Sequence, residues 1–224
     1  YLRVDGGADV YQAKGLSAWS IKDNARGYLG ANYVDVDKDK LAVALKGKVF
    51  SVQGREARVR TMWSHSACAG AWAKEIARAR RKNVEGAFLC GLLHDVGQPA
   101  VLQASLELFS KHHRELDEEV LDAWTQEFHA QVGALMLERW NFPQWMGAAV
   151  RFHHDPYSAG EHVEHALTAQ MADLLAHAST HPDPMADAAL AQHPALADLD
   201  IYTDEFQALL ERREKVLELA KAFQ

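Results

Sequence analysis

The sequence has little cysteine, no long apolar run and no excess of positive charge among its 224 residues. Its two cysteines, Cys68 and Cys90, are too few for the disulfide framework of a small secreted domain, so we expect buried free thiols in a reducing compartment. No stretch approaches the roughly 20 apolar residues that cross a bilayer, and no signal peptide is visible. These absences predict a cytoplasmic protein that does not associate with membranes.

The charge balance argues against nucleic acid as a partner. The formal net charge is -7, whereas a protein that binds a duplex usually presents a basic stripe. The compact basic run at 78–82 suits the C-terminal end of a helix, and we interpret it as a solvated helix end. Apolar residues make up 48% and charged residues 25%, which is ordinary for a globular domain with a hydrophobic core.

Apolar residues recur at steps of three and four along most of the chain, which is typical of helices. No convincing pair of strands is present, so the sequence predicts an all-α fold. The strongest predicted helices cover residues 63–81, 85–96, 102–113, 118–140, 144–154 and 162–177.

Both ends of the chain have weaker patterns. A short helix is expected over 11–25, and the spacing of Leu41, Leu45, Val49 and Val52 predicts another helix after Asp37. Residues 178–200 are expected to form a long loop with one short helix at most. Residues 204–223 are expected to form a single amphipathic helix, which packs on its own domain or forms a homodimer.

The histidines and two aspartates carry the chemistry that this sequence offers. Twelve histidines are many for this length, and seven residues stand at informative places in the predicted helices: His65, His94, Asp95, His129, His153, His154 and Asp173. Taken singly, each has an ordinary explanation: a histidine on an apolar face is more often a core residue than a ligand, a His-Asp pair can cap a helix, and an aspartate can face solvent.

Taken together, these residues favour a metal site. Asp95 and Asp173 lie in strongly apolar segments with few basic residues nearby in the sequence, and burying an unpaired carboxylate is costly. A divalent cation would satisfy carboxylates and imidazoles at once, and this mixture suits iron, manganese, zinc or cobalt better than calcium or magnesium alone. Two such ions would leave a surplus of about two positive charges over two carboxylates, so hydroxide, phosphate or a phosphorylated small molecule is an expected ligand.

The segments around these residues resemble the HDOD (HD-related output) domain, a branch of the HD/HD-GYP metal-dependent phosphohydrolase superfamily. The segments that carry this resemblance are Trp-Ser-His-Ser at 63–66, Gly-Leu-Leu-His-Asp-Val-Gly at 91–97, His-Ala-Gln-Val-Gly-Ala at 129–134 and Trp-Asn-Phe-Pro at 140–143. The resemblance covers about residues 10–222 and is looser toward the N-terminus. It implies a multi-helix HD bundle in a single domain, made of an N-terminal helical subdomain (1–60), an HD core (61–178), and a loop with a C-terminal helix (179–224).

The resemblance also implies a ligand set for two divalent transition-metal ions, iron or manganese rather than zinc. Asp95 would bridge the ions, the first also held by His65, His94 and Asp173, and the second by His129, His153 and His154. In an active enzyme, His94 and Asp95 would be the catalytic residues.

Two departures from the HD-GYP phosphodiesterases weaken any expectation of cyclic-di-GMP cleavage. Gln98 stands where those enzymes carry a lysine, and the Gly-Tyr-Pro motif is missing after His154. HDOD domains are regarded as signalling outputs, so a regulatory module of bacterial signal transduction with a protein partner is the first hypothesis. The complete ligand set favours a second one, a phosphohydrolase or phosphodiesterase acting on a nucleotide or another phosphoester. A di-iron oxidase is a third, which nothing in the sequence selects.

Overall fold

The computed structural model describes residues 49–112 and 117–223, and within these ranges every regular element is helical. The predicted all-α fold is confirmed for this part of the chain. In chain order, the elements are α4 (Glu56–Ala79), α5 (Val84–Leu93), α6 (Gly97–Lys111), α7 (Glu118–Arg139), α8 (Gln144–Arg151), the 3-10 helix η1 (Pro156–His162), α9 (Val163–Thr180), α10 (Pro184–Leu190), α11 (Pro194–Asp198), α12 (Thr203–Leu210) and α13 (Arg213–Lys221).

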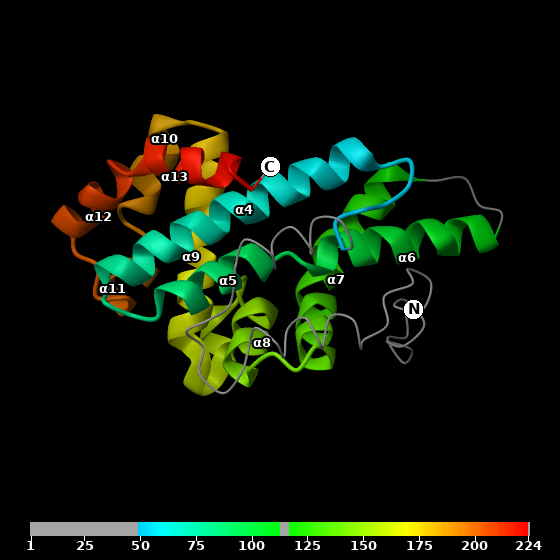
Figure 1. Ribbon diagram of the computed structural model, residues 1–224, viewed down its shortest axis with the longest axis horizontal. Coiled ribbons are helices and arrows are strands. Elements are labelled where there is room, and N and C mark those ends of the chain that lie inside the picture. Colours follow the sequence, from blue (N-terminus) through cyan, green and yellow to red (C-terminus); the bar gives the residue numbers. More distant parts are fainter. Residues whose placement is uncertain (1–48, 113–116, 224) are drawn as a thin grey trace.

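Helix α4 is the central element, and it packs against α5, α9 and α13 (Figure 1). Its buried face carries Trp63 and Trp72, which are 1% and 0% exposed. Their indole N–H groups donate to the Phe223 carbonyl at 2.7 Å and to the Ser179 hydroxyl at 3.0 Å. A buried indole needs a partner for its N–H, so these bonds tie the C-terminal segment and α9 to the central helix.

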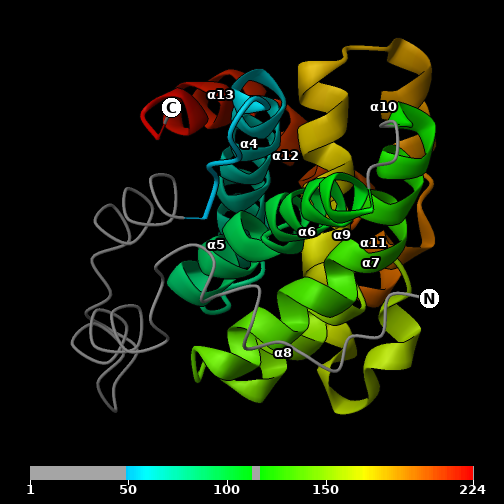
Figure 2. The ribbon, with the colours of Figure 1, turned by 90° about the vertical axis from the view of Figure 1, so that its right-hand side faces the viewer.

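Helices α6, α7 and α8 form the other part of the described fold, where α7 packs against both α6 and α8 (Figure 2). The turn between α5 and α6 places His94 and Asp95 at the junction of the two parts. Gly97 lets α6 and α7 approach closely, because a Cβ atom at this position would lie 2.0 Å from the carbonyl oxygen of His129. The backbone of α7 therefore passes directly beside the His94-Asp95 turn.

Several predicted boundaries were wrong. Val49 and Val52 are buried as expected but lie outside a helix, and the rest of that pattern, like the helix expected over 11–25, falls outside the described residues. The stretch 178–200 contains the end of α9 and two short helices rather than a long loop. Asp183 caps the first by accepting from the Met185 N–H at 2.9 Å, and His193 caps the second. Each cap precedes a proline, which is the preferred order at a helix start.

The predicted C-terminal helix is divided into α12 and α13. Arg212 lies at the break and donates to Glu75 of α4 at 2.5 Å. Glu75 is 2% exposed, and a buried carboxylate needs a charged partner. The break therefore coincides with a tertiary ion pair that no local pattern encodes.

The basic run at 78–82 is only partly a solvated helix end. Arg80 has an 8% exposed side chain, and it donates to the Leu199 carbonyl and, at 2.9 Å, to Glu164. Both cysteines are buried and unpaired, as predicted. None of the described helices is long and apolar enough to cross a membrane.

Candidate metal centre

The structure brings all seven predicted site residues to one place between α4, α5, α7, α8 and α9. They come from separate elements: His65 from α4, His94 and Asp95 from the turn after α5, His129 from α7, His153 and His154 from the segment after α8, and Asp173 from α9. Convergence of side chains from this many elements is the geometric condition for a built site.

Asp95 lies at the centre, and its two carboxylate oxygens face different histidines. Its Oδ1 lies 3.2 Å from His129 Nε2 and 3.7 Å from His153 Nε2. Its Oδ2 lies 3.2 Å from His94 Nε2 and 3.9 Å from His65 Nε2. One carboxylate thus stands between two groups of nitrogen donors.

Asp173 completes the group on the Oδ2 side. Its Oδ1 lies 2.9 Å from His65 Nε2 and 3.7 Å from His94 Nε2. Both His65 and Asp173 keep 22% of their side chains exposed, whereas His94 is fully buried. This group therefore extends from the core to the solvent.

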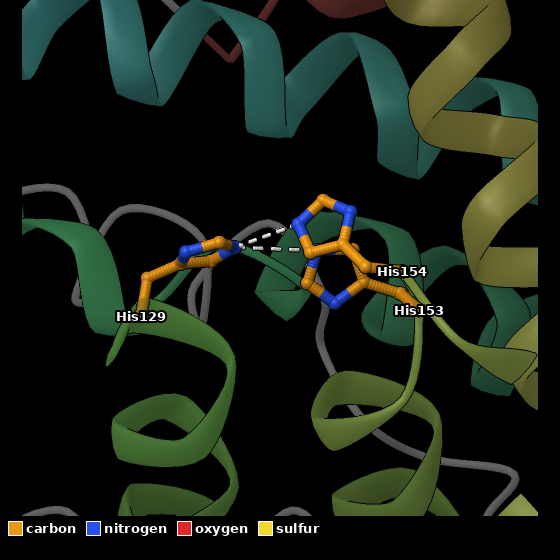
Figure 3. A group of neighbouring side chains, drawn as sticks. All are labelled: His129, His153 and His154. Carbon is orange, nitrogen blue, oxygen red and sulfur yellow. Dashed lines mark hydrogen bonds between the residues drawn. The ribbon is translucent and has the colours of Figure 1, made fainter. Parts of the chain in front are cut away.

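The Oδ1 side is formed by three imidazoles (Figure 3). His129 Nε2 lies 3.0 Å from His154 Nε2 and 3.4 Å from His153 Nε2. His129 and His153 are buried, and His154 is exposed. Three ring nitrogens at such separations form a ready donor set for a cation.

Hydrogen bonds to the main chain fix the orientation of three buried histidines. Each Nδ1 lies 2.7–3.0 Å from carbonyl oxygens three or four residues earlier: His94 from Gly91, His129 from Gln126 and Thr125, and His153 from Val150. A carbonyl only accepts, so each Nδ1 carries a hydrogen and the Nε2 of the neutral ring keeps its lone pair. A histidine that binds a metal through one ring nitrogen usually donates the N–H of its other ring nitrogen to a carbonyl or carboxylate, and this bond fixes the orientation of the ring.

The chemistry of the donor set fits divalent transition-metal ions. Within the part of the chain that the structure describes, three combinations of residues have ligand atoms within 4.8 Å of one another: His129 with His153 and His154, His65 with His94 and Asp95, and His94 with His153 and Asp173. His94 Nε2 is buried and has no hydrogen-bond partner among the described residues, which is costly unless something else satisfies it. Imidazole and carboxylate together suit iron, manganese or zinc.

The electrostatics of the centre keep its carboxylates ionised. Burial alone would raise the pKa of Asp95, but the charge of the neighbouring His94 holds this pKa well below its ordinary value. Burial would also raise the pKa of Asp173, but its hydrogen bond with His65 and the nearby charge of His94 outweigh burial and depress this pKa. Both groups therefore carry the negative charge that a cation needs.

The two buried histidines on either side of Asp95 behave differently. Burial, together with the charge of His94, lowers the pKa of His153 to about 3, so its ring is neutral. Burial also acts to lower the pKa of His94, but the charges of Asp95 and Asp173 outweigh it and raise the pKa well above the ordinary value. A proton on His94 supplies positive charge between these carboxylates, which is the charge that a bound cation would bring.

A pocket of about 420 Å³ connects the centre with the solvent, and His65, Asp95, His129, His154 and Asp173 are among the residues that line it.

Sequence reasoning treated Gln98 only as a missing lysine. Its side-chain amide in fact donates to Asp95 Oδ2 at 2.7 Å. The sequence signal for this contact is that Gln98 follows Asp95 by three residues, which is about one helical turn. Reasoning from sequence also missed His177, which lines the same pocket and follows Asp173 by one helical turn.

Comparisons with known proteins agree with the fold. The family model described as "HDOD domain" matches residues 33–156, which is more than half of the chain. An uncharacterized protein of Treponema pallidum (strain Nichols) is 25% identical over 172 residues, which cover 69% of this chain. The chain spans only 34% of that relative's length.

Two solved structures share the architecture. A protein of Shewanella amazonensis SB2B, described as a candidate phosphohydrolase, superposes with a TM-score of 0.61 at 20% identity, covering 97% of this chain and 84% of that chain. The response regulator MmoQ of Methylococcus capsulatus strain Bath superposes with a TM-score of 0.54 at 21% identity, covering 87% of this chain and 83% of that chain. At these identities, the similarity establishes the fold.

Proposed function

Because the chain belongs to the HDOD domain family, we propose that it is a regulatory domain of bacterial signal transduction that retains a centre for two divalent transition-metal ions. The observation that carries this proposal is the position of Asp95, whose Oδ1 faces His129 and His153 while its Oδ2 faces His94 and His65. A carboxylate placed in this way would be shared by two cations, one beside each group of histidines. Iron or manganese fits the mixture of imidazole and carboxylate.

Each group of ligands would hold one ion. On the Oδ2 side, His65, His94 and Asp173 offer two imidazoles and a carboxylate next to Asp95. On the Oδ1 side the remaining donors are imidazoles only: His129, His153 and His154. The extra carboxylate gives the Oδ2 side the stronger attraction for a cation, so we expect that site to fill first.

The metal content of the protein, purified without added metals, tests this proposal. We expect about two ions per chain, since a bridging carboxylate serves both sites. Asp95→Asn removes the bridging charge with little change in shape, and it should lower the content to one ion or fewer. Asp204→Asn changes an exposed aspartate at the start of α12 and serves as the control. Well-folded wild-type protein that takes up no iron, manganese or zinc would refute the metal centre.

The signalling role rests on the family and on relatives of the fold. The name of MmoQ places that protein among response regulators, and we propose that this domain also passes a signal to a protein partner. We place it in the cytoplasm, where its buried free thiols Cys68 and Cys90 would remain reduced.

We also propose that the chain forms one HDOD-like domain. Its helical start, core and C-terminal helices would unfold together in a single cooperative transition, which calorimetry can test.

A second candidate function, hydrolysis of a phosphoester, is favoured by the pocket that reaches the centre from solvent. Two divalent ions bound there would lower the pKa of water and offset negative charge on a phosphoryl group. The chain's own contribution would be to hold the site: Gln98 restrains Asp95, while Asp95, His154 and His65 present polar atoms to the pocket. The description of the Shewanella protein as a candidate phosphohydrolase points to the same chemistry.

A panel of phosphomonoesters and phosphodiesters, offered to metal-loaded protein, distinguishes the two roles. An enzyme should release phosphate or cleave a diester, and Asp95→Asn should abolish the activity while Asp204→Asn preserves it. Metal-loaded protein that cleaves no member of the panel would remove the second candidate and leave the regulatory role.

A further inference from the structure

The pocket at the metal centre extends beyond the seven candidate ligands. Besides Gln98, which bonds Asp95, its remaining polar lining comes from α4 with Thr61 and Ser64, α7 with Gln126, and three residues at the end of α9. Those three residues are His177, Thr180 and His181. We call this region, defined by these six residues, the outer pocket.

The outer pocket has a defined wall at the end of α9. The rings of His177 and His181 stack with their centroids 4.7 Å apart and an interplanar angle of 25°. The Thr180 hydroxyl donates to the main-chain carbonyls of Ala176 at 3.0 Å and His177 at 3.1 Å. His181 Nδ1 lies 3.1 Å from the same hydroxyl oxygen and can donate to it. These contacts orient both imidazoles at the mouth of the pocket.

The charges around the pocket are unevenly distributed. Among the described residues that line it, none is a lysine or an arginine. The lining instead offers hydroxyls, side-chain amides and imidazoles, while Asp95 and Asp173 add negative charge at the inner end. The C-terminal end of α9 at Thr180 adds the partial negative charge of a helix dipole. With two divalent cations bound beside Asp95 and Asp173, positive charge would be concentrated at the inner end and would be absent from the rest of the described lining.

We propose that the outer pocket binds the uncharged, hydrogen-bonding body of a ligand that carries a single phosphate group, such as a nucleoside or sugar monophosphate. This inference deepens the proposed function and rests on it, since the phosphate would lie at the metal centre. The body, rich in hydroxyl and amide groups, would lie against Ser64, Gln126, His177 and His181. A volume of about 420 Å³ suits such a molecule, because small-molecule sites span roughly 300–1,000 Å³.

The same charge distribution disfavours polyphosphates. A second and third phosphate would extend from the centre into a region without ammonium or guanidinium groups among its described residues. They would also approach the negative end of α9. Proteins that bind nucleoside triphosphates supply backbone N–H groups, lysine or arginine for these additional charges. The outer pocket offers hydrogen bonds from hydroxyl, amide and imidazole groups in their place.

Titration calorimetry on manganese-loaded protein tests the inference with three probes: inorganic phosphate, adenosine monophosphate and adenosine triphosphate. We expect the monophosphate to bind about tenfold more tightly than phosphate, as two or three neutral hydrogen bonds would provide. The triphosphate should bind no more tightly than the monophosphate. Metal content, measured after each titration, shows whether the triphosphate has removed the metal by chelation.

Two variants assign the effect to the outer pocket. His177→Ala and His181→Ala should each weaken monophosphate binding by about three- to tenfold and leave phosphate binding and metal content unchanged. His112→Ala, which alters an exposed histidine outside the pocket, is the matched control. Monophosphate binding no tighter than phosphate binding, tighter triphosphate binding, or full affinity in both variants would overturn the inference. Failure of the wild type to bind metal or phosphate would instead show that the proposed function itself is wrong.

Discussion

Gly97→Ala should damage both the stability of the fold and the metal centre. A Cβ atom at position 97 would lie 2.0 Å from the carbonyl oxygen of His129 and 2.6 Å from the backbone nitrogen of Gly133. Both are main-chain atoms of α7, so no side-chain rotation can relieve the overlap and the two helices must separate. Overpacking of this kind costs about 1–3 kcal/mol.

The helix that would move is the one that carries His129. His129 Nε2 lies 3.2 Å from Asp95 Oδ1, and a displacement of about 1 Å would separate it from the other ligands. We therefore expect Gly97→Ala to lower the melting temperature by roughly 2–12 °C, since about 1 kcal/mol corresponds to about 2–4 °C for a domain of this size. Metal should be lost mainly from the site that His129 serves.

Gly147→Ala provides a matched control, because a Cβ atom there would meet nothing within 4 Å. Gly147 lies within α8, where alanine is the better helix former by about 1 kcal/mol, so this variant should be as stable as the wild type or more stable. Thermal unfolding in the presence of a chelator isolates the packing effect from metal binding. Equal melting temperatures for Gly97→Ala and the wild type would refute the close approach of α6 and α7 as the basis of the site.

Two further substitutions test single contacts. Glu75→Gln should destabilise the fold by about 1–3 kcal/mol at pH 7, because it weakens the ion pairs of a buried carboxylate with Arg212 and Arg78. Burial acts to raise the pKa of Glu75, but the bonds to Arg212 and Arg78 outweigh it and lower the pKa below its ordinary value. The ionised Glu75 therefore adds to the free energy of unfolding above the pKa that it has in the unfolded chain, and this addition is lost as the pH falls through the folded-state pKa. Urea unfolding should show that the difference in the free energy of unfolding between wild type and variant becomes smaller in acid. Gln98→Ala should weaken metal affinity by about 10–100-fold, measured by competition with a chelator, because it removes the amide that holds Asp95.

Gln103→Ala is the matched control for Gln98→Ala, since its amide donates to the exposed Glu107 on the same helix. Unchanged metal affinity in Gln98→Ala would show that the packing around Asp95 suffices to hold the carboxylate. For Glu75→Gln, a constant stability difference from pH 7 down to pH 4 would contradict the assignment of this acid-sensitive contribution to Glu75.

The sequence was sufficient for helices α4 to α9 and for the residues that meet at the site. Spacing of apolar residues at three and four marks the inward face of a helix wherever it packs, so α4 to α9 were predictable within several residues. The residues that meet at the site were predictable because aspartates and histidines in apolar segments need partners that the local sequence does not supply, while their grouping around two ions came from the resemblance to the HDOD domain. Even the Nδ1 bonds of His94, His129 and His153 are local, because they use carbonyls three or four residues earlier.

Tertiary structure alone decided which oxygen of Asp95 faces which histidines, and how the pocket opens. It divided the C-terminal helix at Arg212, which bonds Glu75 of α4, and it buried Arg80 beside Glu164. These contacts join residues 137 and 84 positions apart in the sequence. Periodicity reports which face of a helix is apolar, but not which helix lies opposite. The energy of a buried charge depends on that opposite helix, so the ion pairs and the shared carboxylate appear only when the helices pack.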